Sequence, residues 1–97
     1  QICWGNDYPH YEGTFPYNTE SLQLTFGDIP DRERRMILGE NAAKLYNFDL
    51  EALKPLAEKY GPTPAQVETP LDEVPEDCGC YLFQNERRAR AQARQAS

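Results

Sequence analysis

The apolar residues of this chain fall mainly at helical spacing, with one short continuous apolar run near the start. That run is Ile2-Cys3-Trp4. Together with Gln1 it fits a buried parallel strand better than a strand with one face in water. A stretch rich in proline and glycine follows from Gly5 to Asn18 and predicts a loop. The pattern thus predicts one strand over residues 1–4, a long loop, three or four short helices and an extended tail, without a sheet of several strands.

The first helix is expected to begin after the loop, at Thr19. This residue resembles an N-cap, and Glu20 lies in the first turn, where a carboxylate interacts favourably with the helix dipole. Gly27 is expected to end the element.

Residues 28–46 are expected to form two short helices separated near Gly39. Pro30 suits a first helical turn, Gly39 suits a C-terminal stop, and Asn41 suits an N-cap for residues 42–46. We interpret this region as packing only, without a chemical role. The side chains expected to pack are Met36, Ile37, Leu38, Leu45 and Tyr46, and those expected to face water are Arg32, Glu33, Arg34 and Arg35.

A further helix is predicted between an N-cap at Asp49 and a stop at Gly61. Pro55 lies inside this stretch, lacks an N–H and crowds the carbonyl four residues back, so we expect either a kink there or a start delayed to Pro55. The apolar residues at helical spacing are Leu50, Leu53, Leu56, Ala57 and Tyr60.

The composition changes after residue 61. Prolines alternate with acidic residues between Pro62 and Gly79, and the apolar residues there are isolated, which predicts an extended segment lying over a surface. Residues 86–97 are rich in arginine and alanine. A frayed helix and a solvated terminal tail are both compatible with that composition, and we favour the tail.

Charge and length exclude several classes of protein. The net charge is −6 and the acidic residues are spread along the chain, which disfavours nucleic acid as a partner. No apolar run approaches the ~18 residues of a membrane span, so no membrane partner is expected, and no stretch has the pattern of a signal peptide. With 97 residues the chain can bury only a small core.

The three cysteines do not suggest a disulfide or a zinc site. Cys78 and Cys80 have only Gly79 between them, which is a poor geometry for a disulfide. With one histidine in the chain, this pair lacks the further ligands of a structural zinc site. We interpret all three as free thiols of a cytoplasmic protein.

The loop after the predicted strand holds the residues best suited to chemistry, among them Asp7, His10 and Glu12. Loops that leave the end of a strand commonly carry binding and catalytic groups. Asp7 comes three residues after the predicted strand, so its carboxylate is expected at the carboxyl end of that strand. Two interpretations remain open from the residues alone: a functional carboxylate, or a surface turn in which Asp7 caps the backbone.

Two motifs in the chain resemble a known enzyme family. The first is Trp4-Gly5-Asn6-Asp7-Tyr8-Pro9-His10 with Glu12-Gly13-Thr14-Phe15-Pro16. It resembles the last-strand signature of the amidohydrolase-related metal-dependent hydrolases, in the branch of the aminocarboxymuconate-semialdehyde decarboxylase type. The second, Ile37-Leu38-Gly39-Glu40-Asn41-Ala42-Ala43-Lys44-Leu45-Tyr46, is similar to the closing helical motif of that family. The motifs stand in the family's order and cover roughly the first half of the chain.

The resemblance implies an α/β fold in which this chain is the C-terminal fragment of a (β/α)8 barrel, since a whole barrel needs ~200 residues or more. Residues 1–61 would hold the last barrel strand, the active-site loop and the closing helices, and residues 62–97 the extended tail. The complete enzyme would be a metal-dependent hydrolase or decarboxylase that can form a homo-oligomer. It would act on a small molecule with a carboxylate, amide or ester group. The fragment alone would be inactive.

The resemblance also implies roles for individual residues. Asp7 matches the metal-site aspartate and would be both ligand and catalytic residue, with zinc, or alternatively manganese, as the cofactor. A catalytic zinc site needs at least three protein ligands, so this chain cannot complete the site alone. His10 and Glu12 are candidate substrate-binding residues, with a hydrogen bond inside the loop and a cap on a nearby amide as the respective alternatives. An aromatic wall or plain core packing is expected of Tyr8, Tyr11, Phe15 and Tyr17.

A second hypothesis belongs to a different class. In it the chain is a stand-alone remnant that acts as a small protein-interaction module through its aromatic loop and its proline-rich tail.

Overall fold

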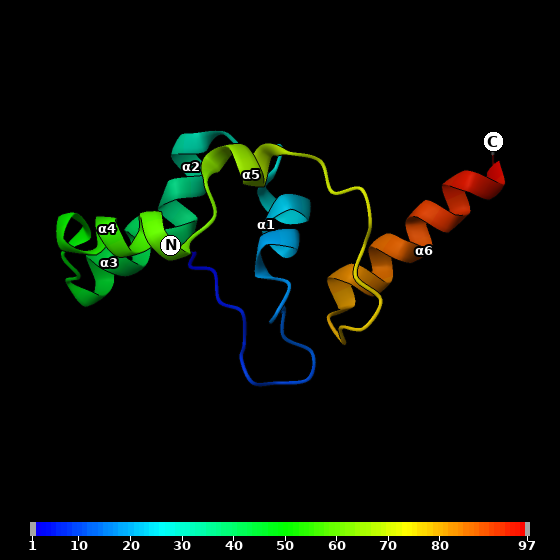
Figure 1. The fold of residues 1–97 in the computed structure, drawn as a ribbon, viewed down its shortest axis with the longest axis horizontal. Coiled ribbons are helices and arrows are strands. Elements are labelled where there is room, and N and C mark those ends of the chain that lie inside the picture. Colours follow the sequence, from blue (N-terminus) through cyan, green and yellow to red (C-terminus); the bar gives the residue numbers. More distant parts are fainter. Residues whose placement is uncertain (1, 97) are drawn as a thin grey trace.

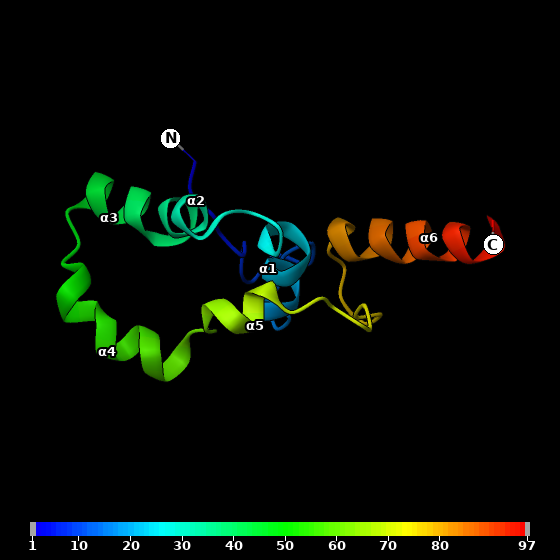
Figure 2. The ribbon, with the colours of Figure 1, turned by 90° about the horizontal axis from the view of Figure 1, so that it is seen from above.

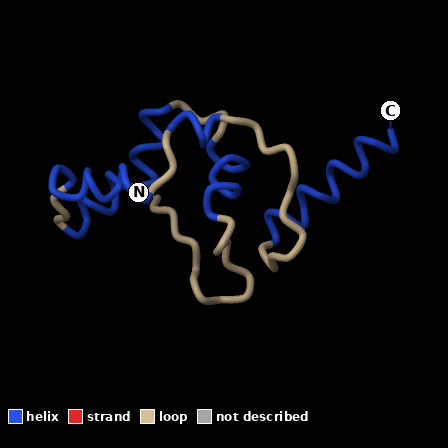
Figure 3. Tube along the Cα trace, in the orientation of Figure 1, coloured by secondary structure: helices blue, strands red, loops and turns tan. Residues whose placement is uncertain are grey.

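The computed structural model describes residues 2–96, and every regular element within them is helical. Figure 1 shows the ribbon, and Figure 3 shows helices joined by loops throughout the described part of the chain. The expectation of a mostly helical chain is confirmed. In chain order the elements are α1 (Asn18–Phe26), α2 (Asp31–Arg35), the π-helical turn η1 (Met36–Glu40), α3 (Asn41–Tyr46), α4 (Leu50–Tyr60), α5 (Pro64–Glu68) and α6 (Tyr81–Ala96).

The strand expected over residues 1–4 does not form in residues 2–4, and Gln1 lies outside the described residues. The backbone there bonds to a helical segment instead. The side-chain amide of Asn41 donates to the carbonyl of Ile2 at 2.9 Å, and the N–H of Trp4 donates to the carbonyl of Ile37 at 3.2 Å. A strand needs a neighbouring strand for its hydrogen-bond ladder, and residues 2–96 contain none. The prediction was therefore wrong for this chain by itself.

Helix α1 begins one residue before its predicted first cap. Tyr17 occupies the N-cap position without a side-chain hydrogen bond to the helix, and its carbonyl accepts the first helical bond from Ser21 at 3.0 Å. Thr19 therefore lies inside the helix, and its prediction as N-cap was wrong. The predicted end at Gly27 is confirmed, because this residue is the C-cap and donates to the carbonyl of Gln23 at 3.2 Å.

Residues 31–46 form one uninterrupted helical segment, α2–η1–α3, in place of the two helices expected. Gly39 lies within the π turn, and Asn41 has the helical angles φ −63° and ψ −44°, so neither residue separates two helices. The segment ends at Asn47, which adopts the left-handed conformation with φ 60°. Leu45 and Tyr46 were expected to be buried, but their side chains are exposed at 65% and 66%.

Helix α4 follows the predicted boundaries. The carboxylate of Asp49 accepts a hydrogen bond from the N–H of Ala52 at 3.2 Å and caps the helix, and Gly61 is the C-cap. The helix runs through Pro55 without a delayed start. None of its residues is buried, so its apolar side is not covered by the described part of the chain.

Two helices lie where an extended segment and a solvated tail were expected. Helix α5 begins with a capping box: the Thr63 hydroxyl accepts from the N–H of Gln66 at 3.1 Å, and the Gln66 side chain accepts from the N–H of Thr63 at 2.7 Å. Pro64 occupies the first turn, where its missing N–H costs nothing. The 16-residue α6 fully buries Phe83. The prediction of an extended chain was thus wrong for residues 64–68 and for the C-terminal tail.

Two small apolar clusters make up the core. Helix α1, which lies between α5 and α6 in Figure 2, contributes to both. The first cluster joins α1 to α5, and the second joins α1 to α6 and the segment before it. The molecule is elongated, with extents of 49 × 28 × 27 Å, and Figure 2 shows α6 projecting from one end. The buried residues are Leu22, Phe26 and Val67 in the first cluster and Cys78, Cys80 and Phe83 in the second.

Arg34 was expected to face water but is 3% exposed. Its guanidinium lies 2.9 Å from the carboxylate of Asp31 and 2.5 Å from that of Glu68, and it donates to the carbonyl of Phe26 at 3.4 Å. These contacts raise the pKa of Arg34 through the hydrogen bond to Glu68 first and that to Asp31 second. A buried charge with two carboxylate partners ties α2 to α5 and to the end of α1.

None of the helices in residues 2–96 combines the length and the apolar composition needed to cross a membrane.

Candidate functional site

The Asp7 loop, residues 5–17, is closed on itself by backbone hydrogen bonds. The N–H of His10 donates to the carbonyl of Asp7 at 2.8 Å, and the N–H of Gly13 donates to the carbonyl of His10 at 3.0 Å. A third bond, from the N–H of Thr14 to the carbonyl of Asn6 at 3.0 Å, joins the two ends. The loop therefore has a definite shape although it contains no regular element.

Gly13 is the residue that lets the loop close. A Cβ atom built on it would lie 2.5 Å from the carbonyl oxygen of Asn6, and 3.1 Å from the carbonyl oxygens of both Asp7 and His10. Real side chains do not tolerate such a separation from backbone, so only glycine fits. The turn at residues 7–10 has a cis peptide bond before Pro9 as its third residue, which is the arrangement of a type VI turn.

Asp7 presents its carboxylate to the outside of the loop. Its backbone is left-handed, with φ 61°, and its side chain is 73% exposed. The capping role belongs to its neighbour, because the side-chain oxygen of Asn6 accepts the N–H of Tyr8 at 3.0 Å. Among residues 2–96 no hydrogen bond to the Asp7 carboxylate is found, so both of its oxygens are available to a ligand.

His10 lies beside Asp7 but is engaged in the loop. Its Nδ1 atom accepts a hydrogen bond from the N–H of Glu12 at 3.3 Å and lies 3.8 Å from Oδ2 of Asp7. An acceptor Nδ1 carries no proton, which leaves the proton of a neutral ring on Nε2. The side chain is 60% exposed. The Nε2 side of the ring therefore remains open to a small molecule.

Glu12 points to the start of α6. Its carboxylate accepts a hydrogen bond from the hydroxyl of Tyr81 at 3.2 Å, and this bond raises the pKa of Tyr81 above the ordinary 10.0. The structure thus brings Asp7 and His10 together and turns Glu12 toward another partner.

The four aromatic residues of the loop do not form a single wall. Tyr8 and Phe15 pack edge to face with their centroids 4.7 Å apart, and both are more than half exposed. Tyr11 is 82% exposed, whereas Tyr17 faces the core and packs edge to face on Phe83 at 6.3 Å. Tyr8 and Phe15 thus form an exposed aromatic pair in the same loop as Asp7.

The described residues do not assemble a metal centre by themselves. Asp7 offers a carboxylate and His10 an imidazole, both common ligands of zinc. Within residues 2–96 no group of three or more histidine, cysteine, aspartate or glutamate side chains is close enough to hold an ion. Asp7 therefore fits a metal site only as one ligand among others from outside these residues.

The segment 77–81 lies against the Asp7 loop, a contact that sequence reasoning missed. The thiol of Cys78 is buried and donates to the carbonyl of Gly13 at 3.4 Å, and the hydroxyl of Tyr17 donates to the carboxylate of Asp77 at 2.5 Å. The signal in the sequence was the Cys-Gly-Cys run, which has small and apolar residues suited to close packing. All three cysteines are free thiols, with Cys3 exposed.

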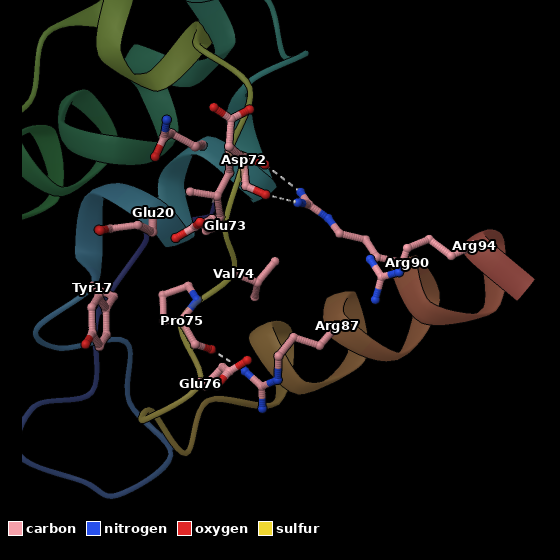
Figure 4. A pocket seen from close by; sticks show the side chains of 12 residues that line it. Tyr17, Glu20, Asp72, Glu73, Val74, Pro75, Glu76, Arg87, Arg90 and Arg94 are labelled. Carbon is pink, nitrogen blue, oxygen red and sulfur yellow. Dashed lines mark hydrogen bonds between the residues drawn. The ribbon is translucent and has the colours of Figure 1, made fainter.

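A polar groove of about 870 Å³ lies between α1 and α6, and Tyr17 is one of the residues that line it (Figure 4). Figure 4 shows Arg87 and Arg90 of α6 facing the segment before the helix. Arg87 donates to the carbonyl of Pro75, and Arg90 donates to the carbonyls of Asp72 and Leu71 at 2.7 Å each. These bonds hold residues 71–75 along α6, so the arginines serve the fold here. The acidic residues in the groove lining are Glu20, Asp72, Glu73 and Glu76.

Comparison with protein families finds one match, in the N-terminal part of the chain. Residues 1–48 match the family model described as Amidohydrolase, a range that holds the loop, α1 and the helical segment 31–46. No curated protein and no solved structure matches the chain. Residues 1–48 of this chain are therefore similar to the amidohydrolase family.

Proposed function

We propose that the chain is the C-terminal part of a metal-dependent enzyme of the amidohydrolase superfamily and that Asp7 contributes its carboxylate to the metal site. The main support for this proposal is the exposure of the Asp7 carboxylate. It is exposed, accepts no hydrogen bond within residues 2–96, and stands in a closed loop inside the matched range. A free carboxylate on a shaped loop is what a cation ligand requires.

The bound cation, zinc or manganese, would supply Lewis acidity toward an oxygen of substrate or water. Asp7 would hold the cation and accept a proton from the attacking water in the hydrolytic case. His10, 3.8 Å from the Asp7 carboxylate, would present its Nε2–H to a substrate oxygen. Because its Nδ1 accepts from the N–H of Glu12, the ring is held in one orientation.

The proposed substrate is a small molecule with an amide, ester or carboxylate group. Hydrolysis and decarboxylation would both fit a carboxylate next to a divalent cation, because the cation would supply Lewis acidity in either reaction. We assign the protein to the decarboxylase branch of the family because the motif from Trp4 to Pro16 resembles the signature of that branch. The exposed Tyr8–Phe15 pair would contact an apolar part of the substrate.

The test is Asp7→Asn in the complete enzyme, with Asp28→Asn as the matched control. Asp28 is an exposed acid without a hydrogen bond in the described residues. We expect Asp7→Asn to lower turnover by more than about 100-fold, since even residues that only support a metal ligand typically account for 10–100-fold, and to reduce bound metal. Melting temperature should hardly change. The measurements are phenolate release from p-nitrophenyl esters, carbon dioxide release from hydroxybenzoates, and metal content by mass spectrometry.

The outcome that contradicts the proposal is equally specific. Near-normal turnover and metal content in Asp7→Asn would remove Asp7 from the metal site. If Asp7→Asn unfolded the protein and Asp28→Asn did not, a structural role of Asp7 in the turn would be the better explanation.

A further inference from the structure

The segment 77–81 touches the Asp7 loop at four separate places. Three are hydrogen bonds: Tyr17 to Asp77 at 2.5 Å, Cys78 to the carbonyl of Gly13 at 3.4 Å, and Tyr81 to Glu12 at 3.2 Å. The fourth is the packing of Gly79 against Tyr11. The two residues of each hydrogen bond are 60 to 69 positions apart in the sequence, so the contact is part of the tertiary fold.

We propose that the segment 77–81 is a positioning element that holds the Asp7 loop in the shape its metal site requires. This inference rests on the proposed function of Asp7 as far as catalysis is concerned. Its structural part, that the segment determines the order of the loop, stands on the contacts alone.

Gly79 sets how closely the segment approaches the loop. A Cβ atom at this position would lie 2.5 Å from Cε2 of the Tyr11 ring and 2.7 Å from the carbonyl oxygen of Tyr11. The ring is at the end of an exposed side chain and can move away. The carbonyl belongs to the backbone, so a side chain at residue 79 must push the loop itself. The fit between segment and loop therefore depends on the absence of a side chain there.

Gly13 connects the segment 77–81 to the turn that carries Asp7. The carbonyl of Gly13 receives the Cys78 thiol, while its N–H is bonded to the carbonyl of His10. Its Cα lies so close to the carbonyls of Asn6 and Asp7 that a Cβ would meet them at 2.5 and 3.1 Å. Gly13 is buried, whereas Asp7 is exposed. A displacement of Gly13 must then be passed to the turn that carries the Asp7 carboxylate.

The segment itself is firmly anchored. Cys80 is 7% exposed and packs in the same cluster as Phe83, which is fully buried. By contrast the loop has few anchors of its own, because Tyr8, Tyr11 and Phe15 are all more than half exposed. The more rigid partner determines the position of the other.

The experiment compares Gly79→Ala with Gly39→Ala, since a Cβ at Gly39 meets nothing within 4 Å. Hydrogen exchange in the 97-residue chain reports on the loop through the amides of His10, Gly13 and Thr14. We expect Gly79→Ala to speed exchange of these amides about tenfold or more, with the amides of α1 unchanged, and Gly39→Ala to leave them as in the parent chain. Tyr81→Phe, which removes one hydrogen bond without added bulk, should have the same effect to a smaller degree.

Turnover and bound metal in the complete enzyme then test the catalytic part. We expect Gly79→Ala to lower kcat at least tenfold with metal still bound, and Gly39→Ala to leave kcat unchanged. Loop exchange equal to that of the parent chain in both Gly79→Ala and Tyr81→Phe would overturn the proposal. Faster exchange with unchanged kcat would overturn its catalytic part. Asp7→Asn is measured alongside. If Asp7→Asn alone left turnover intact, the proposed function would fail, and the exchange data would still decide whether the segment orders the loop.

Discussion

At the scale of single residues, the Tyr17 hydroxyl connects the end of the Asp7 loop to the segment before α6. It donates to the carboxylate of Asp77 at 2.5 Å, and this hydrogen bond is the main reason why the pKa of Tyr17 rises above the ordinary 10.0. Burial and the negative charge of Asp77 act in the same direction. The neutral hydroxyl is thus favoured in the folded chain, because ionisation would bring two negative charges together.

This shift predicts a loss of stability at alkaline pH. The pKa of Tyr17 is higher in the folded chain than in the unfolded one, so its contribution is complete below about pH 10 and is lost as the pH rises through the folded pKa. We expect the urea midpoint of the parent chain to decrease as the pH rises beyond about 10. Tyr17→Phe should be less stable than the parent at pH 8, and its stability should decrease less between pH 8 and pH 11. Tyr46→Phe is the control, since its hydroxyl makes no hydrogen bond within residues 2–96. An equal alkaline loss in Tyr17→Phe and the parent would contradict the prediction.

At the scale of helices, α6 is attached to the rest of the chain mainly through its first three turns. Phe83 is fully buried among Tyr17, Leu24 and the two cysteines that precede the helix. Further along, Arg87 and Arg90 bind backbone carbonyls of residues 71–75. The remainder of α6 projects away from the body, as Figure 2 shows. Docking of this helix should therefore depend on Phe83.

Truncation of this side chain tests that dependence. Replacing a fully buried phenylalanine by alanine removes apolar burial and leaves a cavity, which typically costs about 3–5 kcal/mol. We expect Phe83→Ala to lower the free energy of unfolding by that amount or to release α6, seen as reduced helicity in circular dichroism. Phe48→Ala serves as the control, because Phe48 is 56% exposed and should cost at most about 1 kcal/mol. Similar losses in the two variants would show that α6 is not held by Phe83.

At the scale of the whole molecule, α4 stands apart from the two clusters and leaves an apolar groove of about 600 Å³. Figure 2 shows α4 separated from the helical segment 31–46 along most of its length. Leu50 and Leu53 face this groove, and both are more than 40% exposed. A chain of this size with so much uncovered apolar surface is expected to be marginally stable. The other apolar residues of the lining are Trp4, Leu22, Leu38, Ala57 and Val67.

The groove predicts that the isolated chain binds an apolar fluorescent dye. We expect 1-anilinonaphthalene-8-sulfonate fluorescence to increase with the chain and to fall roughly twofold in Leu53→Glu, because a carboxylate inside the groove repels the sulfonate and opposes burial of the dye. Lys59→Gln brings the same change in net charge on α4, away from the groove lining, and should bind dye like the parent. Sedimentation at several concentrations completes the measurement. A cooperatively unfolding monomer with little dye binding would favour the stand-alone interaction module instead.

Much of the local structure could be predicted from the sequence. The N-cap at Asp49, the ends at Gly27 and Gly61, and the helical spacing of α4 all depend on groups within four residues of one another. The capping box of α5 was equally visible at Thr63 and Gln66 but was overlooked because of the prolines around it. Such features follow from short-range hydrogen bonding and steric limits, which the order of residues specifies directly.

The position of the candidate site in the sequence could be predicted, but the residues that contact it from distant parts of the chain could not. Sequence reasoning located Asp7, His10 and Glu12 in one loop, and the structure brings Asp7 and His10 within 3.8 Å of each other. It did not foresee that Glu12 bonds to Tyr81, 69 residues further on. The partner of an exposed carboxylate depends on which distant segment folds next to it, and no local pattern contains that information.

The sequence by itself determined the helical character of most residues between 18 and 61, the helix ends at Gly27, Asp49 and Gly61, and the loop that carries Asp7. Tertiary structure decided that residues 2–4 lie on a helix and not in a sheet, that Arg34 is buried between two carboxylates, and that the segment 77–81 packs on the loop. The physical reason is the range of the interactions. Caps and turns are satisfied by near neighbours, whereas strand pairing, charge burial and close backbone approach need a partner that only the folded chain provides.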